Sequence, residues 1–426
     1  MKNVRLVYLL GLLTMLVLLT GCGRAVVFAT QAGTSGLRQP GALSLYIDRD
    51  GSLYPIDTAL HRDERQLRSG AGYLLNYYAS QPERLRQLYA HYEVSNLPTA
   101  AAAYPEEGWP ALQALLRRQA AAAVNQRLDQ LGAGATLVVL IHGFNNTPDE
   151  ATKSFEAVEA RLRAEHLPQG PYQVLRVYWD GRRGAIPFFF KIAQPNAQFV
   201  GLGLRGILSR VSHAHPVRII THSLGTLAGC NALWNVVTSM GMTDTLAHAP
   251  HMVFWQNLTT AHNGRGVPRY YYARACHDTA NYQTPTHPDL RMGCIAAATP
   301  GDTYLDYLNR TPNLAATDHN GLYRRIVISY NPTDIVLNKL YVFAFLHRTL
   351  GITNLGRTNY AYNIVAERVN HLSTGGRSYQ VPFYGCHEKG KFNHGLTGYA
   401  NSNQMPTFLN VLLSDSPPPA IMPCPR

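Results

Sequence analysis

The hydrophobic pattern of the chain changes at about residue 134. Beyond that point, short apolar runs alternate with segments in which apolar residues recur at helical spacing. This alternation is typical of a mostly parallel sheet covered by helices on both faces, because strands buried on both sides are apolar throughout. The sequence therefore predicts an α/β domain over residues 134–415. Its predicted strands are residues 136–141, 173–179, 217–221, 293–298 and 325–330.

One helix of this domain is marked by its termini as well as by its periodicity. Thr147 is placed to cap it, Glu150 would complete a capping box, and Pro148 suits the first turn. Apolar residues then recur on one face, which predicts a helix that packs on the sheet. The predicted buried stripe is Ala151, Phe155, Val158 and Leu162.

The segments around this domain have other patterns. Residues 43–55 predict a strand and a turn, and residues 73–92 and 109–131 predict two helices. We interpret residues 43–133 as an N-terminal appendage that packs on the main domain. Residues 238–290 are rich in Tyr and His and interrupt the alternation, which predicts an insertion over the mouth of the sheet, where a lid would lie. Residues 416–426 contain three consecutive prolines and predict an irregular tail.

The N-terminus carries an export signal. Lys2 and Arg5 precede an uncharged run of 14 residues, which is too short for a comfortable membrane span and is typical of a signal peptide over residues 1–21. The run ends in Leu19-Thr20-Gly21-Cys22, which resembles the lipobox of bacterial lipoproteins. That resemblance implies cleavage before Cys22, acylation of this residue and a tether over residues 22–42. An ordinary secreted protein in which Cys22 is incidental is the alternative.

Composition and net charge limit the classes of partner that we expect this protein to bind. The chain has 426 residues, of which 46% are hydrophobic and 15% charged, and this composition excludes disorder and coiled coil. Its net charge of +12 favours anionic partners. Because the chain is expected to be exported, we expect membrane lipid headgroups and not nucleic acid. Gly23 after the lipidated cysteine implies, by analogy with lipoprotein sorting, the outer membrane of a bacterial cell envelope, facing the periplasm or the exterior.

The cysteine count fits an oxidising compartment. Six cysteines are present, and five remain if Cys22 is lipidated. Cys230 lies in an apolar helical segment, so we expect it to be a buried free thiol. The other four predict two disulfides, Cys276 with Cys294 and Cys386 with Cys424.

A serine motif follows the third predicted strand. Residues 217–221 run directly into His222-Ser223-Leu224-Gly225 and then into an apolar helix. This arrangement resembles the nucleophile elbow of α/β-hydrolases, where a serine on a tight strand-to-helix turn projects above the sheet. The usual motif is G-x-S-x-G, and here Thr221 replaces the first glycine. The resemblance implies that Ser223 is a nucleophile.

A second motif follows the first predicted strand. His142-Gly143-Phe144-Asn145-Asn146 resembles the oxyanion loop of the same superfamily, in which backbone N–H groups stabilise the negative charge of an attacked carbonyl. The resemblance implies that the amides of Phe144 and Leu224 are these donors, and that His142 and His222 have structural roles. A bacterial α/β-hydrolase family that pairs an H-G-F-N-N loop with an H-S-x-G elbow is the most similar, over about residues 134–413.

A serine nucleophile needs a general base and a carboxylate that orients this base. In the α/β-hydrolase superfamily both follow the serine along the chain, the acid first. Asp334 comes after the strand predicted at residues 325–330 and matches the usual position of the acid; Asp302, after the preceding strand, is the alternative.

The candidate for the general base lies near the end of the predicted domain. His394 precedes a predicted closing helix over residues 405–413 and matches the loop that carries the catalytic histidine in this superfamily. His387 and His371 are the alternatives.

No metal or cofactor is predicted. His213-Ala214-His215 and His277-Asp278 have no further ligands at suitable spacing. The resemblance implies a membrane-anchored serine hydrolase with an α/β-hydrolase fold that cleaves carboxylic esters, with lipid or phospholipid esters as the first expectation. The fold would also host a thioesterase, amidase or peptidase. The alternative from another class is a non-catalytic lipoprotein that keeps the fold as a binding scaffold.

Overall fold

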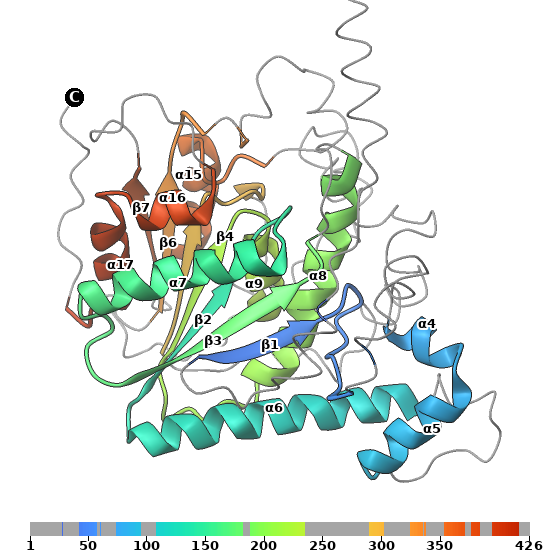
Figure 1. Ribbon diagram of the computed structural model, residues 1–426. Coiled ribbons are helices and arrows are strands. Elements are labelled where there is room, and N and C mark those ends of the chain that lie inside the picture. Colours follow the sequence, from blue (N-terminus) through green and yellow to red (C-terminus); the bar gives the residue numbers. More distant parts are fainter. Residues whose placement is uncertain are drawn as a thin grey trace, which may run out of the picture.

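The computed structural model describes residues 28, 42–57, 60, 74–94, 108–181, 188–234, 289–301, 324–334, 336–337, 353–370, 376–383 and 394–416. Among these residues, seven strands form one sheet in the order β1-β3-β2-β4-β5-β6-β7 (Figure 1). Every pair of neighbouring strands is parallel. The predicted α/β class, with helices around a parallel sheet, is confirmed. The strands are β1 (Leu43–Ile47), β2 (Thr136–Ile141), β3 (Tyr172–Trp179), β4 (Val217–His222), β5 (Leu290–Ile295), β6 (Arg324–Tyr330) and β7 (Gly376–Pro382).

Three strands differ from the sequence-based expectation. β5 begins at Leu290 and not at residue 293, because the charged Arg291 is buried in the strand and hides its apolar pattern. β7 was not predicted, since the polar Arg377, Ser378 and Gln380 interrupt its apolar residues. β1, which the sequence assigned to an appendage, pairs with β3 at the edge of the main sheet.

Helices cover both faces of the sheet. Figure 1 shows α7 in front of the sheet and α8 and α9 behind it. α7 packs against α16 and α17, and α8 packs against α9 and α6. The helices are α4 (Leu74–Ala79), α5 (Pro82–His91), α6 (Trp109–Leu131), α7 (Pro148–Ala164), α8 (Phe188–Leu208), α9 (Gly225–Trp234), α15 (Asn359–Asn370), α16 (Leu396–Ala400) and α17 (Met405–Leu413).

The predicted helix signals are confirmed at α7. The Thr147 hydroxyl accepts a hydrogen bond from the Glu150 amide at 3.2 Å, and the Glu150 carboxylate accepts one from the Thr147 amide at 2.7 Å. Its predicted apolar stripe is fully buried. The helix expected over residues 73–92 is instead two helices, because Pro82 has no N–H to continue a helical ladder and starts a new one.

The strand order reverses beside β2. The chain steps from β2 to β3 on one side and then to β4 on the other side. The loops that leave the carboxyl ends of β2 and β4 therefore lie side by side, while the helices that follow cover opposite faces. In open parallel sheets, such a reversal point is where ligands bind.

Several predictions fall outside the described residues. These are the signal peptide, the acylated Cys22, nearly all of the tether, residues 238–288 of the insertion and residues 417–426 of the tail. Cys230 and Cys294 are both buried. Each predicted disulfide has at least one cysteine outside the described part, so both stay predictions. Within the described ranges, no helix is long and apolar enough to cross a bilayer.

Candidate active site

Ser223 lies on the turn between β4 and α9. Its φ is +52°, a left-handed conformation that is unfavourable for a residue with a side chain and is often found at functional sites. Backbone hydrogen bonds hold this conformation: the Ser223 amide donates to Ile295 at 2.9 Å, and its carbonyl accepts from Thr226 at 3.1 Å and from Ala298 at 3.2 Å. The turn therefore presents the Ser223 hydroxyl at the carboxyl edge of the sheet.

His394 connects Ser223 to Asp334. Its Nε2 lies 2.8 Å from Ser223 Oγ, and its Nδ1 lies 2.8 Å from Asp334 Oδ2 and 3.0 Å from Oδ1. The three side chains follow β4, β6 and β7, and parallel strands bring those ends to one edge of the sheet. The three residues named from the sequence thus form one continuous hydrogen-bonded chain.

The Asp334 carboxylate is buried and receives further hydrogen bonds. Its Oδ1 accepts from the amides of Val336 and Leu337, each at 3.0 Å, and its Oδ2 accepts from the Tyr399 hydroxyl at 2.9 Å. Burial favours a raised pKa for Asp334, but His394 and these donors outweigh burial and hold the pKa below its ordinary value of 3.8. Asp334 is therefore ionised at neutral pH and can orient the imidazole of His394.

The loop after β2 packs directly against the serine turn. A Cβ on Gly143 would lie 2.8 Å from the Cβ of Ser223, so only glycine permits this approach. The amides of Asn145 and Ser223 take part in backbone hydrogen bonds, whereas those of Phe144 and Leu224 take part in none with the described backbone. Two amides beside Ser223 are thus available to a bound oxygen.

Two buried histidines tie the loops together. His222 donates from Nε2 to the carbonyl of His394 at 2.6 Å, and burial lowers the pKa of His222 to about 3. His142 accepts from the amide of Trp179 at 3.1 Å and donates to the carbonyl of Gly143 at 2.9 Å, and burial lowers the pKa of His142 to about 4. Both side chains are neutral at neutral pH and bind backbone groups, in agreement with structural roles.

The alternatives for the acid and the base, Asp302, His387 and His371, lie outside the described residues. In the described part of the chain, no group of three His, Cys, Asp or Glu side chains is arranged to hold a metal ion. His215, from the histidine pair near residue 213, lies 3.1 Å from the carbonyl of Ala135 and 3.0 Å from the carboxylate of Asp129. These two contacts account for it as a structural residue.

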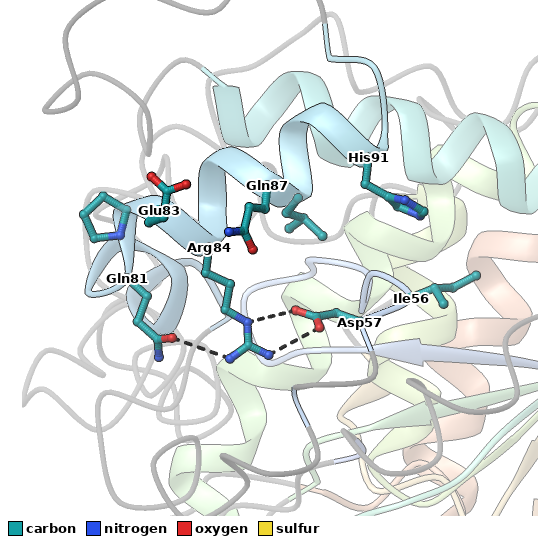
Figure 2. A pocket seen from close by; sticks show the side chains of 9 residues that line it. Ile56, Asp57, Gln81, Glu83, Arg84, Gln87 and His91 are labelled. Atoms are coloured by element: carbon teal, nitrogen blue, oxygen red, sulfur yellow. Dashed lines mark hydrogen bonds and ion pairs between the residues drawn. The ribbon is translucent and has the colours of Figure 1, made fainter.

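A cavity of about 620 Å³ lies elsewhere, between α5 and the segment after β1 (Figure 2). Arg84 points across it to Asp57, with N–O distances of 3.1 and 3.3 Å, and His91 lies opposite Ile56. No residue of the serine site lines this cavity. We therefore treat it as separate from the candidate active site.

Sequence reasoning missed Tyr399 and the bond from His222 to His394. Tyr399 is 65 residues from Asp334, and His222 is 172 residues from His394. No local pattern marks either contact, because the partners are brought together only by the sheet.

The chain matches no protein-family model, no curated protein and no solved structure.

Proposed function

We propose that this protein is a serine hydrolase that cleaves carboxylic esters through a covalent acyl-enzyme. The observation that carries the proposal is the chain of hydrogen bonds from Ser223 through His394 to Asp334. A serine, a histidine and a buried carboxylate in this geometry recur on unrelated folds wherever a serine hydroxyl is activated for acyl transfer.

In the proposed reaction, Ser223 Oγ attacks the ester carbonyl while its proton passes to His394 Nε2. The C–O double bond becomes a C–O⁻ single bond, and the amides of Phe144 and Leu224 donate to this oxyanion. Collapse of the intermediate breaks the bond to the leaving alkoxide, which takes the proton from His394. A water molecule then repeats the sequence on the acyl-enzyme, releasing the acid and restoring Ser223. Asp334 stays ionised and stabilises the imidazolium in both halves.

Three features support an α/β-hydrolase assignment within this proposal. The residues occur along the chain in the order serine, acid, histidine, as in that superfamily. Ser223 has the left-handed backbone expected of an elbow. The loop of Gly143 lies against it, where an oxyanion loop belongs.

The substrate class follows from the expected location. A lipobox at Cys22 and a net charge of +12 favour a protein held on an anionic membrane surface, where lipid and phospholipid esters are the nearest substrates. We therefore propose a lipid-anchored enzyme whose first candidate substrates are membrane lipid esters.

Labelling with a fluorophosphonate probe tests the activity. We expect the wild type to be labelled and Ser223→Ala to be unlabelled. Ser209→Ala is the matched control, because Ser209 is exposed on the turn after α8 and should leave labelling unchanged. A folded wild type without labelling would instead favour the non-catalytic binding scaffold.

Fractionation tests the anchor. Cys22→Ala should remove incorporated palmitate and release the protein from membranes, because it removes the acylation site of the lipobox. If the variant stays with membranes after a salt wash, the lipoprotein proposal is wrong.

A further inference from the structure

Tyr399 contacts the carboxylate of Asp334, the acid of the candidate site. It lies in α16, five residues after His394, and is buried. Its hydroxyl lies 2.9 Å from Asp334 Oδ2 and 3.1 Å from the side-chain nitrogen of Asn331. Asn331 and Asp334 share the loop after β6, so Tyr399 joins this loop to the segment that carries His394.

The direction of these two hydrogen bonds is determined by Asn331. Its side-chain oxygen accepts from the amide of Thr333 at 3.1 Å and from the Thr333 hydroxyl at 2.8 Å. Its nitrogen therefore faces Tyr399, and an amide nitrogen can only donate. Because the Tyr399 oxygen accepts that bond, its own proton points to Asp334.

The hydroxyl proton of Tyr399 binds the same oxygen of Asp334 that accepts the shorter hydrogen bond from His394. Asp334 Oδ2 has the shorter of the two contacts to His394 Nδ1, and Tyr399 is its other donor. Burial and the neighbouring Asp334 raise the pKa of Tyr399 well above 10, so the hydroxyl stays a donor. The Phe383 ring packs against the Tyr399 ring, with 5.2 Å between their centroids.

We propose that Tyr399, itself aligned by Asn331, is a positioning residue that orients the Asp334 carboxylate toward His394. The inference rests on the proposed function, since it gives this orientation a role in ester cleavage. Without the hydroxyl, Oδ2 is held by His394 alone, while Oδ1 keeps its two amide donors. The carboxylate can then turn about its Cβ–Cγ bond, and the imidazole loses part of its alignment toward Ser223.

Tyr399→Phe tests the proposal, because it removes the hydroxyl and keeps the ring. The matched control is Tyr362→Phe, which removes the hydroxyl of a half-buried tyrosine that bonds to the carbonyl of Ser378 at 3.1 Å and not to Asp334. The first readout is the low-field proton resonance of the bond between His394 and Asp334, identified by its loss in His394→Gln. This readout does not depend on turnover.

We expect the resonance to move upfield in Tyr399→Phe, because a carboxylate that can turn forms a longer and less well aligned hydrogen bond with the His394 proton. It should not move in Tyr362→Phe. We also expect kcat for an activated ester to fall about 10-fold with KM unchanged, since the loss concerns the chemical step.

An unmoved resonance overturns the proposal, even if the rate falls. A moved resonance with unchanged kcat also overturns it, because the orientation would then not serve the reaction. If the wild type is not labelled by fluorophosphonate while the resonance still moves in Tyr399→Phe, the orientation by Tyr399 stands and the proposed function fails.

Discussion

Thr221 lies two residues before Ser223, where the motif that this segment resembles has glycine. Thr221 is fully buried, and its hydroxyl lies 3.1 Å from that of Thr226 and 3.2 Å from the carbonyl of Gly293. Its methyl group occupies space that Gly229 leaves on α9, since a Cβ on Gly229 would lie 2.8 Å from it. Gly229 thus leaves room on α9 for the methyl group of Thr221.

This contact predicts a coupled pair of substitutions. Gly229→Ala should destabilise the protein by about 2 kcal/mol, because the added methyl overpacks the space beside Thr221. In a Thr221→Ser background, which lacks the methyl, the cost should be smaller by about 1 kcal/mol. Urea denaturation of the four proteins measures the coupling. Additive effects would mean that Met292, the other neighbour of that position, is responsible for the cost.

The charge of Asp334 gives a second prediction at this scale. Asp334→Asn should keep the fold but lose the charge that stabilises the His394 imidazolium, and turnover should fall by about 10⁴, by analogy with serine proteases. Asp302→Asn should cost far less. Both variants are compared on a small activated ester after thermal unfolding shows that they are equally stable. A loss confined to Asp302→Asn would place the acid after the preceding strand.

At the scale of elements, a row of buried arginines on the sheet binds the carboxyl end of α17. Arg218, Arg291 and Arg325 are in register on β4, β5 and β6, close to the amino ends of these strands, and all are buried. Arg291 and Arg325 donate to the carbonyl of Ser414, directly after α17, at 2.7 and 2.8 Å. Cations at the carboxyl end of a helix are also favoured by its dipole. The row therefore stabilises the edge of the sheet opposite the candidate active site.

Arg291→Met should destabilise the protein by about 2 kcal/mol. The substitution removes one of the two arginine donors of the Ser414 carbonyl, of which Arg325 remains, and the ion pair with the exposed Asp415, whose N–O distance is 2.8 Å. Arg163→Met is the control, because Arg163 is 64% exposed and its ion pair should contribute less than about 1 kcal/mol. Chemical denaturation gives both values. Equal small effects would show that α17 is held by its apolar face alone.

At the scale of the whole molecule, the candidate site joins four loops that leave one edge of the sheet. The loops after β2, β4, β6 and β7 meet there, and the neutral His222 links two of them through the carbonyl of His394. Burial is the main factor that opposes protonation of His222 in the folded protein. Lowering the pH should therefore destabilise the folded state, with its joined loops, before the pH is low enough to protonate the folded side chain.

The folded pKa of His222, about 3, lies below the ordinary 6.5, so the unfolded state binds more protons and stability falls as pH drops below 6.5. In His222→Asn, the loss of unfolding free energy between pH 6.5 and 5.5 should be smaller by about 1 kcal/mol than in the wild type. Asp48 acts in the opposite direction, because burial raises its pKa to about 7. The difference between variants, and not the total slope, therefore isolates His222.

Urea denaturation at the two pH values provides the measurement. His213→Asn, at an exposed histidine, is the control for replacing a histidine by asparagine. An unchanged slope in His222→Asn would mean that His222 takes up its proton equally in the folded and unfolded states.

Local patterns in the amino-acid sequence were sufficient to predict many helices and strands of this molecule and the candidate nucleophile. The predicted bounds of α6 and α17 agree with the structure and the capping box of α7 is present, because capping and helical periodicity act within a few residues. Ser223 was named from a motif at a strand end, and Asp334 and His394 from their places after a strand and before the closing helix, in the order that the resemblance implied. The sheet brings the three within hydrogen-bond distance. The start of β5, the edge position of β1 and the orientation of Asp334 by Tyr399 required the fold. The buried Arg291 pairs with Asp415, which is 124 residues away along the chain, and Tyr399 reaches the carboxylate of Asp334 only when the fold has formed. Neither contact is between neighbours in the sequence, so no local pattern predicts it.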